Sequence, residues 1–159
     1  MMGNIFAGSE IVEIGIQIEK NGKDFYDETV KRSKSQKAKE IFQYLASEEE
    51  KHIAMFRTIL DAVHKYEPAE AYPGEYFAYM NALASGYVFT QENKGKEVAA
   101  STKSDLEAID MGIKFEKDSI VFYEGMKKVV PEHENKIVDE LIDQEKSHLA
   151  KLVVLKKEL

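Results

Sequence analysis

The chain has 159 residues, of which 43% are hydrophobic and 32% charged, and its formal net charge is −7. This composition is typical of one folded domain, and the negative charge argues against nucleic acid or an anionic membrane as a partner. The sequence contains no cysteine, which excludes disulfides, thiol catalysis and any cysteine-ligated metal.

No segment of the sequence predicts a membrane span or a secretory signal. Its apolar runs are short, as in Leu152–Leu155, whereas a bilayer requires about 20 apolar residues. The first residues, Met1–Glu10, lack the basic start and apolar core of a signal peptide. We therefore expect a cytoplasmic protein.

Apolar residues recur at helical spacing through most of the chain. Ser9 suits an N-cap, Ser104 and Glu107 have the spacing of a capping box, and Pro131 suits the first turn of a helix. The pattern predicts four long helices, over about Ser9–Lys31, Gln36–Tyr66, Ser104–Val129 and Pro131–Leu159.

The segment between the second and third helices, residues 67–103, is too long for a tight turn. A short helix is expected within it at Glu75–Leu83. Its aromatic cluster either caps the bundle or forms a subunit interface, and comprises Tyr72, Tyr76, Phe77, Tyr79, Tyr87 and Phe89.

The short connections elsewhere make each neighbouring helix pair an antiparallel hairpin. We therefore predict an all-α, antiparallel four-helix bundle with one long crossover connection. It would form a single domain, residues 1–159, whose halves 9–66 and 104–159 are related by a pseudo-twofold axis.

The two halves share a repeat that carries polar residues. Gly15–Lys20 resembles Gly112–Lys117, and a Phe-Tyr pair follows each copy. About thirty residues further on, each half contains Glu-x-x-His, and on a helix residues three apart can reach the same ion. The pattern provides four carboxylates and two imidazoles, from Glu19, Glu49, His52, Glu116, Glu145 and His148.

The four glutamates lie on helix faces that are otherwise apolar. Glu49, for example, shares its face with Leu45 and Ile53. Four ionised carboxylates in a core are very unfavourable unless their charge is compensated. Two divalent cations would cancel that charge, and small residues near Glu19 and Glu116 are expected to leave room for the ions: Gly15, Gly22, Gly112 and Ser119.

Other polar residues with similar spacing are expected outside the site. His64 follows Asp61 by three residues, but it lies twelve residues beyond His52 on the same helix and so faces elsewhere. We interpret His64 and His133 as surface histidines. Glu48 and Glu50 flank a candidate ligand and are interpreted as part of a solvated face.

Two tyrosines occupy equivalent positions in the repeat. Tyr26 and Tyr123 each follow a candidate ligand, Glu19 or Glu116, by seven residues. One interpretation is core packing with a satisfied hydroxyl group. The other is a hydrogen bond that orients a metal-bound carboxylate.

Two copies of a glutamate followed by Glu-x-x-His resemble the ferritin-like diiron carboxylate superfamily, and within it the rubrerythrin-like proteins. The resemblance covers the whole chain. It implies that Glu49 and Glu145 bridge two irons, that Glu19 and Glu116 are terminal ligands, and that each histidine binds one iron. The catalytic role of the four glutamates would be exerted through these metals.

The sequence departs from that family in two respects. Similar rubrerythrins place an additional glutamate three residues before Glu116, where this chain has Ile113. In the family that carboxylate is linked to a redox-dependent shift of one iron. Rubrerythrins also commonly carry a cysteine-rich rubredoxin module as electron donor, which a sequence without cysteine does not contain.

The resemblance implies an oxidoreductase with two irons that reduces hydrogen peroxide or reacts with dioxygen. An external protein would donate the electrons, and the enzyme would be a homodimer. Manganese or a mixed-metal centre also suits imidazole and carboxylate ligands. The alternatives are a ferroxidase or iron-handling protein of the ferritin type, which normally forms a large hollow shell, and a structural bundle that has lost activity.

Overall fold

The computed structural model describes residues 8–66 and 74–159, and all regular structure within them is helical. This confirms the predicted all-α class. The helices are α1 (Gly8–Arg32), α2 (Gln36–Tyr66), α3 (Gly74–Ser85), α4 (Lys94–Ser101), α5 (Asp105–Met126) and α6 (Asn135–Glu158), with short 3-10 turns η1 (Val88–Thr90) and η2 (Glu132–Glu134).

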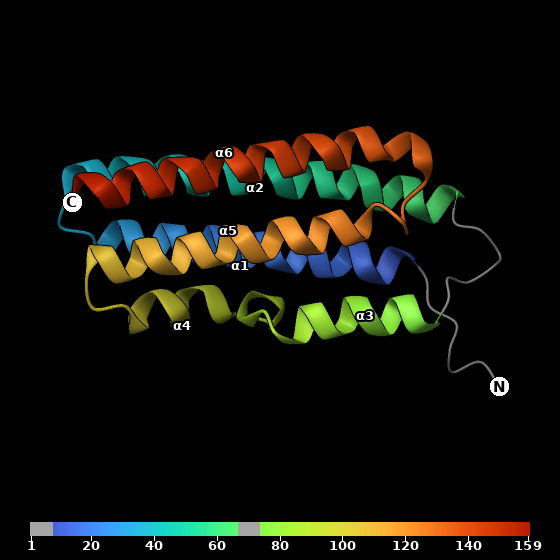
Figure 1. Cartoon of the computed structure of the whole chain (residues 1–159), viewed down its shortest axis with the longest axis horizontal. Coiled ribbons are helices and arrows are strands. Elements are labelled where there is room, and N and C mark those ends of the chain that lie inside the picture. Colours follow the sequence, from blue (N-terminus) through green and yellow to red (C-terminus); the bar gives the residue numbers. More distant parts are fainter. Residues whose placement is uncertain (1–7, 67–73) are drawn as a thin grey trace.

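The helices form three layers, as Figure 1 shows. Helices α2 and α6 make one layer and α1 and α5 the next, with α1 packed on α2 and α5 on α6. The crossover forms the third layer, in which α4 and η1 pack on α1 and α3 packs on α5. The antiparallel four-helix bundle with a long crossover is therefore confirmed.

Phe89 of the crossover packs against a flank of the bundle rather than its end. The centroid of its ring lies 5.5 Å from that of Phe25 and 4.9 Å from that of Phe115, whereas Tyr79 is 50% exposed. The side chain of Phe77 lies outside the described residues. Tyr76 donates a hydrogen bond to the Gly125 carbonyl. Tyr72 lies outside the described residues.

Several helix boundaries differ from those expected. Helix α1 begins at Gly8, so that Ser9 lies inside its first turn, and α5 ends at Met126. Pro131 precedes the 3-10 turn η2 instead of opening α6. Ser104 does cap α5, since its hydroxyl oxygen accepts a hydrogen bond from the Glu107 amide.

One buried asparagine fixes the crossover to α1. The Asn21 amide donates to the carbonyls of Phe89 and Gln91, both at 2.6 Å. Its side-chain oxygen accepts from the backbone amides of Lys94 and Gly95, both at 3.0 Å, and thereby caps α4, a helix that the sequence did not predict. All four hydrogen-bonding capacities of this amide are used.

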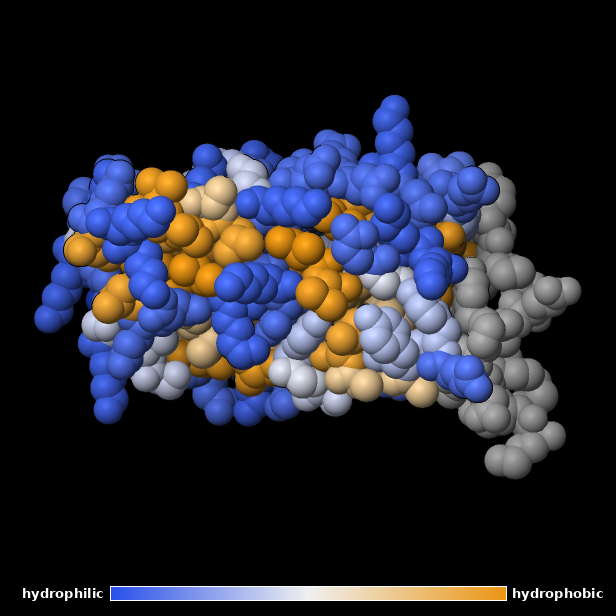
Figure 2. Space-filling model, in the orientation of Figure 1, coloured by the Kyte–Doolittle hydropathy of each residue, from blue (hydrophilic) through white to orange (hydrophobic). Residues whose placement is uncertain are grey.

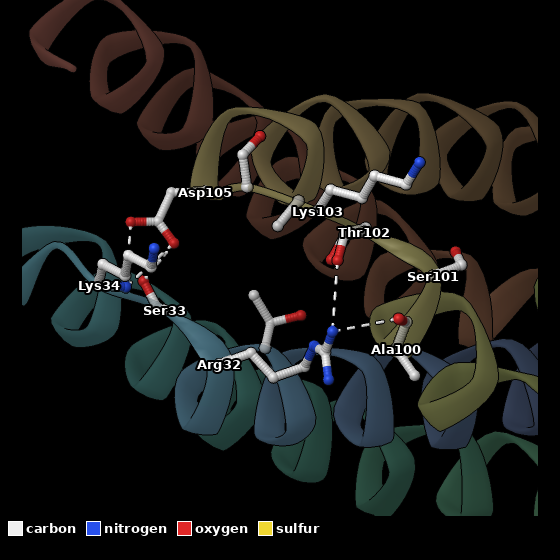
Figure 3. Close-up of a pocket in the computed structure, with 11 residues that line it drawn as sticks. Arg32, Ser33, Lys34, Ala100, Ser101, Thr102, Lys103 and Asp105 are labelled. Atoms are coloured by element: carbon white, nitrogen blue, oxygen red, sulfur yellow. Dashed lines mark hydrogen bonds between the residues drawn. The ribbon is translucent and has the colours of Figure 1, made fainter.

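The loop between α1 and α2 is held by the first residue of α5. The Asp105 carboxylate accepts hydrogen bonds from the Ser33 hydroxyl at 2.8 Å and from the Ser35 amide at 2.9 Å. Arg32 donates to the carbonyl of Ala100 at 3.2 Å, across the cavity drawn in Figure 3. These contacts fix one end of the bundle, where the α1–α2 hairpin meets the start of α5.

The surface over α5 and α6 mixes apolar and charged groups, as the orange and blue areas of Figure 2 show. The exposed large apolar residues of these helices include Leu106, Val121 and Val154. Within the described ranges, none of the helices is long and apolar enough to cross a membrane.

Candidate metal centre

The bundle brings all six candidate ligands together in its interior. Each of the four long helices contributes, because the glutamates and histidines lie on the faces that α1, α2, α5 and α6 turn toward one another. The exposed fraction is 0% or 1% for every one of them: Glu19, Glu49, His52, Glu116, Glu145 and His148.

The six residues form two overlapping groups with the geometry of metal sites. One group contains Glu19 and His52, the other contains Glu116 and His148, and both contain Glu49 and Glu145. Within each group the potential ligand atoms lie within 4.8 Å of one another. Glu49 and Glu145 are thus common to both groups of ligands, as a pair of neighbouring ions would require.

Most oxygen atoms of these glutamates lack a hydrogen-bond donor among the described residues. Six of the eight are buried without one: both oxygens of Glu49 and of Glu145, and Oε2 of Glu19 and of Glu116. Buried polar atoms normally have a partner, and an unpaired carboxylate is costly. The donor set of carboxylate oxygens and imidazole nitrogens therefore fits a pair of divalent cations.

The two tyrosines of the repeat bind carboxylates across the bundle. Tyr26 of the first half donates to Glu116 Oε1 of the second at 2.8 Å, and Tyr123 donates to Glu19 Oε1 at 2.6 Å. Each hydroxyl group therefore holds the glutamate of the other half, so the orienting contact is present. A hydrogen bond of this kind was one of two interpretations of the sequence. The sequence did not indicate that each tyrosine would bind the glutamate of the other half.

The glycines beside the ligands leave room for side chains of other helices, and whether they also leave room for ions stays a prediction. A Cβ atom on Gly15 would lie 2.8 Å from Phe56 Cε1. One on Gly22 would contact the Phe115 ring and lie 3.2 Å from Glu49 Oε2. The Ser119 hydroxyl group donates to the carbonyl of its own helix.

Burial and mutual repulsion set the ionisation of the cluster. Burial raises the pKa of Glu49 well above its ordinary value, and the charges of Glu145 and Glu19 raise it further. The pKa values of Glu116 and Glu145 are raised for the same reasons. Burial also acts to raise the pKa of Glu19, but hydrogen bonding from Glu49 and the nearby His52 hold it below its ordinary value.

The two imidazole rings differ in their ionisation. Burial acts to lower the pKa of His52, but Glu19 and the Gln144 hydrogen bond raise it to about 9. Burial and the neighbouring His52 lower the pKa of His148 to about 4. Without metal the cluster therefore retains protons, and the binding of cations would release them.

The two histidines present one ring edge to the carboxylates and the other toward the α2–α6 surface. The rings are stacked with centroids 5.4 Å apart. Nδ1 of His52 lies 2.7 Å from Glu145 Oε1, and Nδ1 of His148 lies 3.5 Å from Glu49 Oε1. The opposite nitrogen, Nε2, faces Gln144 on one ring and Glu48 on the other.

The interpretation of Glu48 as part of a solvated face is wrong. Its side chain is only 14% exposed and lies 4.0 Å from His148 Nε2. Glu50 is exposed, as predicted. His64 is exposed, and the His133 side chain is 59% exposed, so neither belongs to the cluster.

Gln144 and Glu48 are site residues that were not predicted from the sequence. The repeat contained the signal, because each residue directly precedes the glutamate of a Glu-x-x-His motif and lies four residues before its histidine. Ile113, at the position of the family's additional glutamate, is partly buried and packs against the core.

The fold and this site together define a ferritin-like helical bundle with a diiron-type carboxylate cluster. A family model for rubrerythrin matches residues 10–156, and the chain belongs to the rubrerythrin family, whose members hold diiron centres.

The chain is also similar to a solved structure from Thermotoga maritima, described as a candidate ferritin-like diiron-carboxylate protein. The two are 28% identical, with a TM-score of 0.72, over 97% of each chain. No curated protein matches the chain.

Proposed function

We propose that the chain is a non-haem diiron oxidoreductase that reduces hydrogen peroxide or reacts with dioxygen, with electrons from a separate donor protein. The observation that carries this proposal is the pair of overlapping ligand groups that share Glu49 and Glu145. Membership of the rubrerythrin family supports iron as the metal. Carboxylate and imidazole ligands are compatible with iron or manganese.

Each ligand has the free atoms that its proposed role requires. Glu49 and Glu145 have two free oxygens each, so that each can offer one oxygen to either metal. Glu19 and Glu116 have one free oxygen each, because a tyrosine binds the other, and would therefore bind one metal. Four carboxylates and two divalent ions then balance in charge.

The bound irons would supply the two electrons that, with two protons, convert hydrogen peroxide into two molecules of water. The protein contributes the surroundings of that reaction. The crossover and the buried rings of Phe25, Phe89 and Phe115 cover the α1–α5 side. Glu48 and Gln144 are partly exposed on the α2–α6 side, from which a small oxidant and protons would reach the cluster.

The test is metal analysis of protein purified without oxygen, followed by addition of hydrogen peroxide while the optical spectrum is recorded. We expect about two metal ions per chain and a new absorption band after peroxide is added. Less than about one metal ion per chain, or a spectrum unchanged by peroxide, would refute the proposal.

Two controls accompany this experiment. The double variant Glu49→Ala/Glu145→Ala should lose both metals and remain helical, because it removes the residues common to both ligand groups. A mass measurement in solution separates the proposal from iron storage. A homodimer is expected for the oxidoreductase, whereas a large hollow shell would favour the ferritin type.

A further inference from the structure

The two ligand groups are alike in charge and donor type, but their surroundings differ. Each group contains three glutamates and one histidine, and two of those glutamates are common to both. A difference between the two metal positions must therefore come from outside the ligand set. The outer edges of the histidine rings are where the structure shows one.

His52 has a neutral partner at its outer nitrogen. Its Nε2 lies 2.7 Å from Gln144 Oε1, within hydrogen-bond distance. The side-chain NH2 group of Gln144 is directed to Glu140 at 3.5 Å, which leaves the amide oxygen facing the ring. The His52 Nε2–H group therefore donates to this oxygen, and Nδ1, which would bind a metal once its proton is displaced, faces Glu145 and Glu19.

His148 has a charged neighbour at the equivalent place. Glu48 Oε2 lies 4.0 Å from His148 Nε2, too far for a hydrogen bond but close enough for its charge to act on the ring. Lys51 pairs with Glu48 at 2.9 Å, but the Lys51 side chain is 68% exposed and screens that charge weakly.

The asymmetry arises at equivalent positions of the repeat. Glu48 and Gln144 each directly precede the glutamate of a Glu-x-x-His motif, and each faces the histidine of the other half. Because one half has a glutamate here and the other a glutamine, the metal position next to His148 has an additional negative charge beside it, and the position next to His52 does not.

We propose that Glu48 and Gln144 are positioning residues that make the two metal positions unequal, so that the position next to His148 fills first. This inference rests on the proposed two-metal centre. The charge of Glu48 acts through space on the His148 ring and attracts a cation bound to it, whereas the hydrogen-bonded amide of Gln144 orients the His52 ring without adding charge.

The experiment is a titration of the metal-free full chain with Co²⁺, under competition with a chelator, to measure two dissociation constants. The wild type should show two unequal steps. Glu48→Gln removes a unit charge about 8 Å from the ion, and should therefore weaken the tighter step by about 2- to 30-fold and make the two steps similar. Gln144→Glu should strengthen the weaker step.

The most informative variant exchanges the two partners. Glu48→Gln/Gln144→Glu keeps the net charge and should restore two unequal steps with the order of filling reversed. Proton NMR at one equivalent of Co²⁺, with labelled histidine, would show which ring carries the shifted Nε2–H signal. Glu50→Gln removes an exposed charge from the same turn as Glu48 and should change neither step.

The outcomes separate this inference from the function on which it rests. Two equal steps in the wild type, or two steps that Glu48→Gln leaves unchanged, would overturn the asymmetry while the two-metal centre stands. Unchanged order in the exchanged variant would overturn it as well. Failure of the wild type to bind Co²⁺ at all would overturn both the asymmetry and the metal centre.

Discussion

Replacing Glu49 by glutamine should stabilise the metal-free protein while it abolishes normal metal binding. Glu49 is fully buried, neither of its oxygens has a hydrogen-bond donor among the described residues, and burial together with Glu145 raises its pKa well above the ordinary 4.5. Glutamine has the same shape without the charge, and its NH2 group can donate to the neighbouring carboxylates.

The size of the effect follows from the buried carboxyl group that the substitution replaces. Burial and the neighbouring carboxylates disfavour the charged form of Glu49, and a buried polar group without a hydrogen-bond partner costs about 1–3 kcal/mol. Glu49→Gln removes this cost. For a chain of this length that corresponds to a rise in Tm of about 2–12 °C at pH 7. The gain should shrink as the pH falls toward the ordinary pKa of a glutamate, because the unfolded wild type then binds the proton as well.

The assay is thermal unfolding followed by circular dichroism, with a chelator and then with Fe²⁺ or Mn²⁺ under anaerobic conditions. With metal the order should reverse, because the wild type gains binding energy and the variant gains much less. Glu50→Gln removes an exposed charge and should leave the Tm nearly unchanged. A metal-free Glu49→Gln protein no more stable than the wild type at pH 7 would show that the buried Glu49 carboxyl group does not destabilise the fold.

Three further predictions follow from the same contacts. Tyr123→Phe removes the hydrogen bond to Glu19, and should weaken metal binding and shift the spectrum of the oxidised cluster; unchanged affinity and spectrum would show that the ring only fills space. Asn21→Ala removes four hydrogen bonds to the crossover and should lower the free energy of unfolding, measured with denaturant, by about 2–4 kcal/mol. A decrease of less than about 0.5 kcal/mol would mean that packing alone holds the crossover on α1. The metal-free fold should lose stability from pH 7 to 9. The pKa of His52 is raised to about 9 in the folded protein, so the proton that His52 holds stabilises the fold, and this stabilisation is lost as the pH rises through that value. The lowered pKa values of Glu19 and His148 act only at more acidic pH, so a metal-free Tm that increases from pH 7 to 9 would contradict this sign.

The sequence predicted the bundle and its buried ligands well, because both depend on local periodicity. Helical spacing located the long helices, and the apolar neighbours of residues such as Glu49 placed the carboxylates inside. The repeat then brought two equivalent sets of residues together. That these residues bind metal stays a prediction.

Contacts between distant segments were not predictable in the same way. Which carboxylate Tyr26 binds depends on how the two halves cross in space, and Asn21 caps a helix more than seventy residues away. Glu48 resembled any exposed glutamate, since its position beside His148 is set by the packing of α2 against α6. The space beside Gly15 is taken by Phe56 from another helix, which periodicity on one helix does not show.

The proposed diiron centre requires that two metal ions bind within the two ligand groups and share Glu49 and Glu145. Anomalous X-ray diffraction at the iron edge, on crystals of anaerobically reconstituted protein, would locate these ions. We expect two neighbouring iron peaks, one beside His52 and one beside His148, with Glu49 and Glu145 between them. No peak within the bundle, or a single iron away from these glutamates, would contradict it.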